Sequence, residues 1–411
     1  MQILIIAYVL PEPKSTGSGK RMMELMHLFL AKGWSVHVAS SAQNTEYSED
    51  LSSLGIKASE ITVNDSSFDD FIAKISPNIV LFDRFLMEEQ FGWRVAKHCP
   101  KALRILETID LHCLREARHQ QKKRTHMVAL EPAKADLYSE IALREIASIY
   151  RSDMSLLISD YEVEVLDKYF SVPKGILHLC PFMLQRVPQE KPSFSDRQHF
   201  LTIGNFRHAP NWDAVLWLKQ ELWPLIRGKL PKAELHIYGA YTPPKATALH
   251  NVKEGFLIKD RAVNVLDVMQ QARINLAPLR FGAGIKTKLA DAMLAGTPSV
   301  TTSVGAEGMT GGLPWAGSMA DHAQDFADKA VALYQDEGAW LQSQKHGEAI
   351  LHSLFDPIKN GQALLERVQW LLNNIEEHRF NNFTGKMLNH HHHRSTEFMS
   401  RWIEAKNKPA D

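Results

Sequence analysis

The chain has 411 residues, which suggests two or three domains at about 150 residues each. Its 47 basic residues balance 47 acidic ones, so charge gives no sign of a protein that coats nucleic acid, and we expect no nucleic-acid partner. The three cysteines have neither disulfide-framework nor zinc-ligand spacing, which fits a reducing compartment such as the cytoplasm. The first apolar run lacks a basic leader and a small-residue cleavage site, and no run of about 18 apolar residues is present to span a bilayer.

The first half of the chain alternates strand and helix patterns. Residues 3–7 form a short β-branched apolar run, which predicts a strand buried on both faces. Residues 11–19 are turn formers, and apolar residues then recur at spacings of three and four as far as Gly33, where a helix would end. With the alternating residues 35–38 as a second strand, the order is that of a βαβ unit. We expect further strands at 79–82, 103–106 and 154–158, a helix at 88–97, and a largely helical stretch over 111–150.

A segment rich in proline and polar residues, 187–195, marks the boundary between two predicted domains, 1–187 and 196–355. After this segment the alternation of strands and helices resumes. Each half has the size and pattern of a doubly wound domain of the nucleotide-binding type, so the fold class is predicted as α/β. In the second half we expect strands near 200–205, 235–239, 274–277 and 299–302, and helices near 211–222, 263–269, 286–295 and 323–334.

The last part of the chain reads as a helix followed by a tail. Residues 356–380 are expected to form a helix, because apolar residues share one face from 357 to 377. Residues 381–411 are polar and are predicted to pack weakly. Their four histidines, 390–393, could bind a metal adventitiously, but no acidic partner stands at ligand spacing, and we predict no catalytic metal.

The first candidate site is the loop Gly17, Ser18 and Gly19, which opens the first helix after the first strand. Open α/β sheets bind ligands at this edge, and a helix N-terminus with nearby glycines suits a phosphate group. The loop is not a Walker motif, since Arg21 stands where Ser or Thr is required, and it lacks the third glycine of a dinucleotide fingerprint. An ordinary turn is the alternative interpretation.

The second candidate site is a loop with Gly282 and Gly284 that leads into a helix carrying Lys286 and Lys288 in its expected first turn. Cations there oppose the helix dipole and cost a few tenths of a kcal/mol each, roughly, a cost that an anionic ligand would offset. Asp291 on the same helix could accept the hydroxyl protons of a ribose. The alternative is a solvated helix face.

Other polar residues follow predicted strands at the same edge. Arg207 could clamp a diphosphate, while Asp110 and His112 could orient or deprotonate a hydroxyl of an acceptor. Glu307 could read a ribose or sugar hydroxyl. Surface and capping roles are the alternatives for all four. The basic run 115–124 is interpreted as a solvated helix face, or else as a surface that attracts an anionic acceptor or a membrane.

These residues carry a resemblance to a known family. The second half resembles the nucleotide-sugar-binding domain of GT-B glycosyltransferases, especially family 4 and its relatives, the glycosyl transferases of group 1. The first half is similar to the acceptor domain of that family. The matching stretches are 203–214, 281–293, 295–298 and 302–308 in the second half, and 17–21 and 31–36 in the first.

The resemblance implies two Rossmann-like domains that face a cleft, with residues 356–380 as the helix that crosses back to the first domain. It implies a retaining, metal-independent transfer of a sugar from a nucleoside diphosphate sugar to a hydroxyl of a glycan, a lipid-linked acceptor or a small molecule. No cofactor other than this donor is implied. The expected location is the cytoplasm, with at most a weak peripheral contact at the inner face of the membrane.

The resemblance also assigns roles to the candidate residues. Arg207, Lys286 and Lys288 would bind the diphosphate, and Asp291 would bind the ribose. The family often carries two glutamates eight positions apart; Asp291 matches the second, but the first falls on Ala283, which has no carboxylate. The backbone N–H groups of Gly282, Gly284 and Ile285 would then contact the sugar. A nucleotide-sugar epimerase and a non-catalytic GT-B scaffold or partner subunit are the alternatives that remain open.

Overall fold

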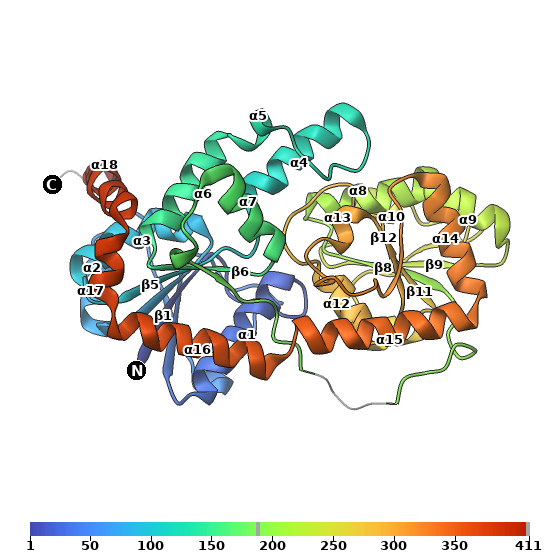
Figure 1. The fold of residues 1–411 in the computed structure, drawn as a ribbon, viewed down its shortest axis with the longest axis horizontal. Helices are drawn as coiled ribbons and strands as arrows, with labels where there is room; N and C mark the ends of the chain where they lie inside the picture. The colour runs from blue at the N-terminus through green and yellow to red at the C-terminus, as the bar shows by residue number, and fades with distance from the viewer. Residues whose placement is uncertain (186–189, 408–411) are drawn as a thin grey trace.

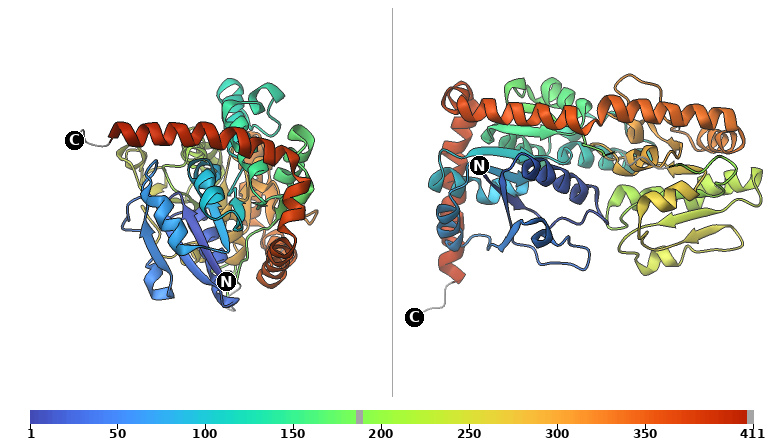
Figure 2. Two further views of the ribbon diagram at one scale, coloured as in Figure 1. Left: turned by 90° about the vertical axis from the view of Figure 1, so that its left-hand side faces the viewer. Right: turned by 90° about the horizontal axis from the view of Figure 1, so that it is seen from below.

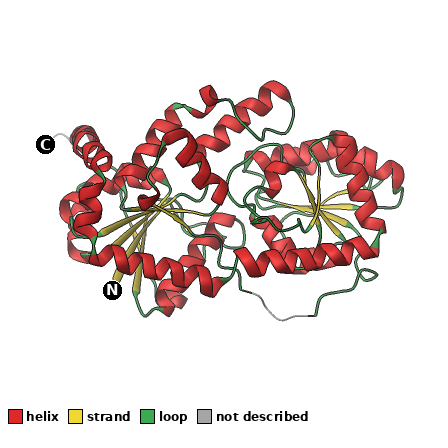
Figure 3. Cartoon of the chain, in the orientation of Figure 1, coloured by secondary structure: helices red, strands yellow, loops and turns green. Residues whose placement is uncertain are grey.

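The computed structural model of the chain describes residues 1–185 and 190–407, the side chains of 392–394 excepted. Two parallel sheets form separate halves of an elongated molecule, and helices cover both faces of each sheet (Figure 1, Figure 3). The last strand of the first sheet ends at Leu179 and the first strand of the second begins at Phe200. Part of the expected boundary, 187–195, lies outside the described residues. The chain is thus an α/β protein with two Rossmann-like halves.

The N-terminal sheet has seven parallel strands in the order β3-β2-β1-β4-β5-β6-β7. In β1, Ile3 and Ile5 enter one core while Leu4 and Ile6 enter another, because successive side chains of a strand point to opposite faces. The order reverses between β1 and β4, which opens a crevice at their carboxyl ends. The strands are β1 (Gln2–Ala7), β2 (Ser35–Ser40), β3 (Lys57–Glu60), β4 (Ile79–Asp83), β5 (Leu103–Glu107), β6 (Met154–Leu157) and β7 (Leu177–Leu179).

Helices connect these strands as parallel pairing requires. They are α1 (Gly17–Ala31), α2 (Ser67–Ile75), α3 (Phe85–His98), α4 (His112–Thr125), α5 (Lys134–Leu137), α6 (Glu140–Arg151) and α7 (Asp160–Phe170), with short 3₁₀ turns η1 (Leu51–Leu54) and η2 (Lys174–Ile176).

The C-terminal sheet has six parallel strands in the order β10-β9-β8-β11-β12-β13. Its strands are β8 (Phe200–Ile203), β9 (Leu235–Tyr238), β10 (Phe256–Ile258), β11 (Ile274–Ala277), β12 (Ser299–Thr301) and β13 (Gly317–Met319). Its helices are α8 (Ala209–Trp217), the π-helical η3 (Leu218–Leu222), α9 (Trp223–Lys229), α10 (Pro244–Thr247), α11 (Val265–Gln271), α12 (Thr287–Leu294), α13 (Ser303–Ala306), α14 (Ala323–Gln335) and α15 (Glu337–Leu354).

The apolar runs of the sequence locate the central strands to within about two residues, and the edge strands are the ones they miss. In β3, for example, the four residues are largely exposed and polar, so no apolar run marks the strand. Burial on both faces is what makes a central parallel strand visible in a sequence. Helix α15 is a further element that the sequence analysis does not predict.

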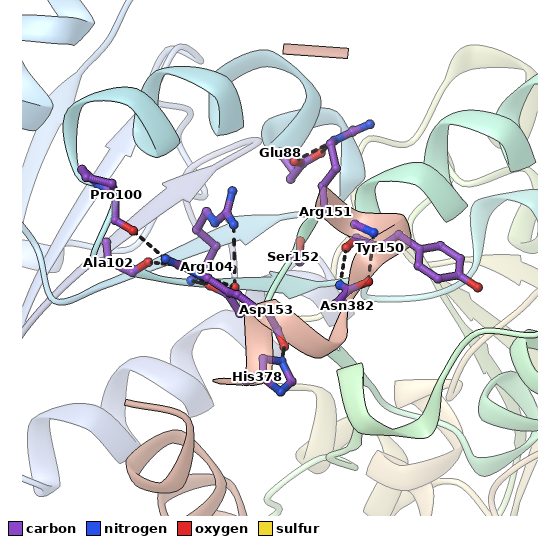
Figure 4. Close-up of polar contacts among 12 residues, drawn as sticks. Glu88, Pro100, Ala102, Arg104, Tyr150, Arg151, Ser152, Asp153, His378 and Asn382 are labelled. Atoms are coloured by element: carbon purple, nitrogen blue, oxygen red, sulfur yellow. Dashed lines mark hydrogen bonds and ion pairs between the residues drawn. The ribbon is translucent and has the colours of Figure 1, made fainter. Parts of the chain in front are cut away.

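The chain returns to the N-terminal half after α15. Helix α16 (Pro357–Asn373) buries Leu364, Val368 and Leu371 in the core that β1 shares, and it runs below α1 in Figure 1. The short α17 (Ile375–Asn381) is fixed to the start of β6, since Arg379 donates to both carboxylate oxygens of Asp153 at 2.7 Å. Figure 4 shows His378 beside Asp153, whose backbone oxygen lies 2.7 Å from the His378 ring nitrogen.

The described part of 381–411, predicted as a weakly packed polar tail, is helical, and most of its described side chains are exposed or half-buried. Residues 383–407 form α18 (Phe383–Asn407), which lies across the end of the N-terminal half against α3 and α6 (Figure 1, Figure 2). The Asn382 side chain donates a hydrogen bond to the backbone oxygen of Tyr150 at 2.8 Å. The Ser400 hydroxyl oxygen accepts one from the guanidinium of buried Arg94 at 3.0 Å. Polar residues face inward, whereas Phe398 and Trp402 are exposed, so the apolar pattern gave no sign of the docking face.

Candidate functional site

A cavity of about 740 Å³ lies between the two halves, at the carboxyl ends of both sheets. Its walls come from the loops after β1, β4 and β5 on one side and after β8, β9 and β11 on the other. This is where doubly wound sheets bind ligands. The predicted site residues that line it are Gly17, Ser18, Asp110, His112, Arg207, Gly282, Ile285, Lys286, Lys288 and Asp291. Gly19, Gly284 and Glu307 are not among the lining residues.

Two helix N-termini meet at this cavity. Helix α1 begins at Gly17 and α12 begins at Thr287, and a Cβ atom on Gly17 would stand only 2.7 Å from the Thr287 Oγ1 atom. Glycine is therefore needed at position 17 for the two halves to approach closely. No side chain caps α12. The positive ends of two helix dipoles thus border one space, which favours an anion there.

Three cations of the C-terminal half border the same space. Lys286 is buried, and its Nζ donates to the Gly284 oxygen at 2.5 Å. Lys288 Nζ donates to Asn211 Oδ1 at 2.7 Å, while the exposed Arg207 places its guanidinium 3.6 Å from the ring centroid of Tyr241. The sequence analysis expected Lys286 in the first turn of α12. In the structure it is the N-cap residue of that helix.

Burial changes the protonation of both lysines. It lowers the pKa of Lys288 to about 7 and holds the pKa of Lys286 below its ordinary value. Charged lysines are poorly solvated there, and they stand at the positive end of a helix. A phosphate ligand would relieve both costs.

Asp291 lines the cavity from α12 and is paired across it. Its Oδ2 accepts a hydrogen bond from Lys20 Nζ of α1 at 2.6 Å. Burial raises the pKa of Asp291, although the Lys20 ammonium acts in the opposite direction. The sequence analysis singled out Asp291 but not Lys20, because the two residues are far apart in the chain and meet only when the halves face each other.

Asp110 and His112 stand on the N-terminal wall, with His112 Nε2 3.6 Å from Asp110 Oδ1. Burial opposes ionisation of Asp110, but the Arg115 guanidinium that binds it, together with His112, brings its pKa down to about 2. Burial lowers the pKa of His112 to about 4. At neutral pH the carboxylate is therefore ionised and the imidazole is neutral, able to donate one hydrogen bond and accept another.

Two buried carboxylates fix the start of α4 and with it the position of His112. Glu145 accepts hydrogen bonds from the backbone N–H groups of His112 and Cys113 at 2.9 Å each. Glu162 accepts one from Leu111 at 2.7 Å. Burial raises the pKa of Glu145 to about 7 and that of Glu162 to about 8. No local sequence signal could have found this pair, because both glutamates lie more than thirty residues along the chain.

Two of the predicted glycines have packing roles. Gly19 faces the backbone of Glu12, where an added Cβ atom would come within 2.5 Å of the Glu12 carbonyl carbon. Gly284 has a φ of +61°, and a Cβ atom there would stand 2.9 Å from the Cβ of Asp110. Gly284 therefore lets the C-terminal loop pack against the Asp110 segment, and neither glycine borders the cavity.

Glu307 is held by a buried ion pair and does not line the cavity. Its two carboxylate oxygens accept from Arg118 Nη1 at 2.8 Å and Nη2 at 2.5 Å, and both side chains are buried. Arg118 belongs to the basic run 115–124, whose end at Lys123 and Arg124 is an exposed helix face, whereas Arg118 itself is buried. Arg118 and Lys122 bind Glu307 and Asp213 of the other half, so this part of α4 joins the two halves.

Two kinds of site are absent from the part of the chain that the structure describes. No group of three or more His, Cys, Asp or Glu side chains gathers there in a way that could hold a metal ion. Nor is any helix within the described ranges long and apolar enough to cross a membrane.

Comparison with known proteins gives one family and one fold. Residues 197–336 match the family model described as glycosyl transferases group 1. No curated protein matches the sequence.

Solved structures resemble nearly the whole chain. Sucrose-phosphate synthase from Thermosynechococcus elongatus is 14% identical with a TM-score of 0.64, over 90% of this chain and 99% of that one. A point mutant of TarM from S. aureus, in complex with fondaparinux, α-GlcNAc-glycerol and UDP, is 10% identical with a TM-score of 0.68. The match covers 90% of this chain and 99% of that one. HepE from Anabaena, in complex with UDP, is 11% identical with a TM-score of 0.63. The match covers 90% of this chain and 100% of that one. At these identities the likeness shows the fold, which is that of GT-B glycosyltransferases.

Proposed function

We propose that this chain, which has the GT-B fold and carries a glycosyl transferases group 1 domain over residues 197–336, moves a sugar from a nucleoside diphosphate sugar to a hydroxyl group of an acceptor. The observation that carries the proposal is the positive wall of the interdomain cavity. There Lys286, Lys288 and the N-terminus of α12 face the N-terminus of α1. A departing diphosphate is the anion that a sugar transfer produces.

The chemistry follows from charge. When the bond between sugar and diphosphate breaks, negative charge grows on the leaving phosphate, and donors fixed in advance around it lower the barrier. Lys286 and the open N-terminus of α12 can supply this stabilisation, with Lys288 and Arg207 beside them. We infer that these cations do the work that a metal ion does in other transferases. Retention of the anomeric configuration is proposed from the family resemblance.

The donor's ribose is assigned to Asp291. Lys20 occupies its Oδ2, and among the described residues its Oδ1 has no hydrogen-bond partner. This oxygen is therefore available to accept a ribose hydroxyl while the link to α1 stays in place.

The acceptor would enter from the N-terminal wall, where neutral His112 can accept a hydrogen bond from the reacting hydroxyl or donate one to the transferred sugar. Candidate acceptors are hydroxyls of a glycan, of a lipid-linked sugar or of a small molecule. A cytoplasmic location and a weak contact with a membrane remain predictions of the sequence.

Transfer can be tested with purified protein and a panel of UDP-, GDP-, ADP- and TDP-sugars, each with and without a mixture of sugar acceptors. We expect one donor to release its nucleoside diphosphate faster when an acceptor is present, and NMR of the product to show a retained anomeric configuration. Addition of EDTA should leave the rate unchanged. A modified sugar from donor alone would identify an epimerase, and binding without turnover of any donor would identify a scaffold.

A further inference from the structure

The N-terminal wall of the cavity holds a group of residues that the proposed donor site does not use. Tyr8 and Val9 follow β1, and Arg84 follows β4, so they stand at the carboxyl ends of two adjacent strands. The Arg84 guanidinium lies 5.0 Å from the ring centroid of Tyr8. Tyr8 is 43% exposed and Val9 40%, although both are part of the cavity wall. Together they offer an open ring face beside a cation.

The backbone of Arg84 is in a conformation that favours glycine. Its φ is 70° and its ψ is 159°, a region that residues with a side chain avoid. Hydrogen bonds on both sides hold it there, from Arg84 N–H to the Glu107 oxygen at 2.8 Å and from Met87 N–H to the Arg84 oxygen at 3.1 Å. Glycine would remove the strain, so the folded chain gains nothing from arginine through the backbone. The side chain must supply the benefit.

The N–H donors of the Arg84 guanidinium are free to bind a ligand. Its ion-pair partner is Asp83, whose Oδ1 stands 3.9 Å away, and within the described residues no hydrogen bond reaches this guanidinium. The other oxygen of Asp83 is taken by the backbone N–H of Tyr8 at 3.0 Å. Only 15% of the Arg84 side chain is exposed. A poorly solvated arginine fork with open donors suits a planar carboxylate or a phosphate.

The same wall leads to the reacting groups. Phe85, the residue after Arg84, meets the His112 ring edge to face at a centroid distance of 5.3 Å. The Arg84 charge is close enough to contribute to the low pKa of His112. The cations assigned to the donor lie on the opposite wall, in the C-terminal half. An anion at Arg84 would therefore belong to the second substrate.

We propose that Tyr8 and Arg84 form an acceptor subsite, and that the acceptor carries an anionic group, a phosphate or a carboxylate. The arginine fork binds this group, the Tyr8 ring packs against the adjoining sugar, and the reacting hydroxyl is directed toward His112. This inference rests on the proposed sugar transfer and names the class of its acceptor.

The test measures binding of small sugars to the full chain that is already saturated with the nucleoside diphosphate it prefers, so that the donor site is filled. The probes are glucose 6-phosphate, glucuronate and neutral glucose, in isothermal titrations at low salt. We expect an anionic probe to bind at least about 10-fold more tightly than glucose, from one charge-assisted bidentate contact. The two anionic probes distinguish phosphate from carboxylate.

The variants are Arg84→Gly and Arg84→Met, with Arg144→Met as the matched control. Arg144 is an arginine of the same half that lies 5.4 Å from the Phe85 ring, pairs with Glu89 and is outside the cavity wall. We expect both Arg84 variants to lose the preference for the anion, while binding of the nucleoside diphosphate is unchanged. Arg84→Gly should melt no lower than wild type, because it relieves the strained backbone. The control should keep the preference.

Equal binding of glucose and both anionic probes by the wild type, or a preference that survives in Arg84→Gly, would overturn the subsite while leaving the donor site intact. Failure of every nucleoside diphosphate to bind would instead count against the proposed function itself. Weaker binding of the nucleoside diphosphate by the Arg84 variants would assign Arg84 to the donor site and overturn the acceptor subsite.

Discussion

The two walls of the cavity are built in different ways. On the C-terminal wall the candidate groups lie in two short segments, 204–211 after β8 and 282–291 after β11, where glycines, lysines and helix starts follow one another in the chain. On the N-terminal wall, single residues follow β1, β4 and β5, and the segment after β5 is held by buried carboxylates from two distant helices. A diphosphate can be bound by backbone N–H groups and nearby lysines, which local sequence supplies. The neutral imidazole of His112 is positioned by hydrogen bonds from the start of its helix to residues that lie far away in the chain.

The largest predicted effect concerns the link between the walls. Arg118→Met leaves Glu307 buried without its partner, and breaking such a pair costs about 3–5 kcal/mol. We expect the free energy of unfolding, measured with denaturant, to fall by that amount.

A matched control is Arg124→Met, which removes an arginine from the same helix. Its ion pair with Asp136 is at the surface, where the Arg124 side chain is 55% exposed, so the free energy of unfolding should fall far less than in Arg118→Met. Similar losses in the two variants would show that the Arg118–Glu307 pair does not hold the halves together.

The next effect is on the C-terminal wall alone. Lys286→Ala should lower kcat by about 100-fold or more, because it removes a fixed cation from the place where the leaving charge grows. Initial rates at saturating donor measure this. Lys329→Ala, which removes an exposed lysine paired with Asp325, should leave kcat unchanged. A wild-type rate in Lys286→Ala would remove this lysine from the mechanism.

A smaller effect is the pH dependence of donor binding. Burial lowers the pKa of Lys288 to about 7, and the proposed diphosphate ligand would favour the protonated form. As the pH rises above 7, binding must first restore the proton, so the affinity for the nucleotide sugar should fall, by up to about 10-fold per pH unit. Titrations between about pH 6 and 9 measure the slope. Lys288→Met should bind more weakly with a flat profile, and an equally steep slope in that variant would assign the pH dependence to another group.

The sequence predicted the parts that depend on local pattern. Central strands such as β1 are apolar on both faces, and the loops after them had to reach one edge, so Lys286, Lys288 and Asp291 could be placed in one cleft beforehand. The ion pair of Glu307 was not foreseen, because its partner, Arg118, lies 189 positions away. Local pattern cannot show a partner on another domain.

Other features depend on conformation or on the direction of a face. Arg84 carries no motif, and its importance rests on a backbone conformation that only coordinates reveal. Helix α18 docks through Ser400 and leaves Trp402 exposed, the reverse of the usual amphipathic pattern. Such features become visible only after the halves are folded.

The most direct test of the central claim is thermal denaturation with UDP, GDP, ADP, CDP and TDP, each beside its phosphate-free nucleoside. A ligand at 100 times its dissociation constant adds about 2.7 kcal/mol of stability. We predict that at least one nucleoside diphosphate raises the melting temperature, that its nucleoside does not, and that the double variant Lys286→Ala, Lys288→Met loses the shift. No shift with any diphosphate, or the full shift in the double variant, would contradict the account.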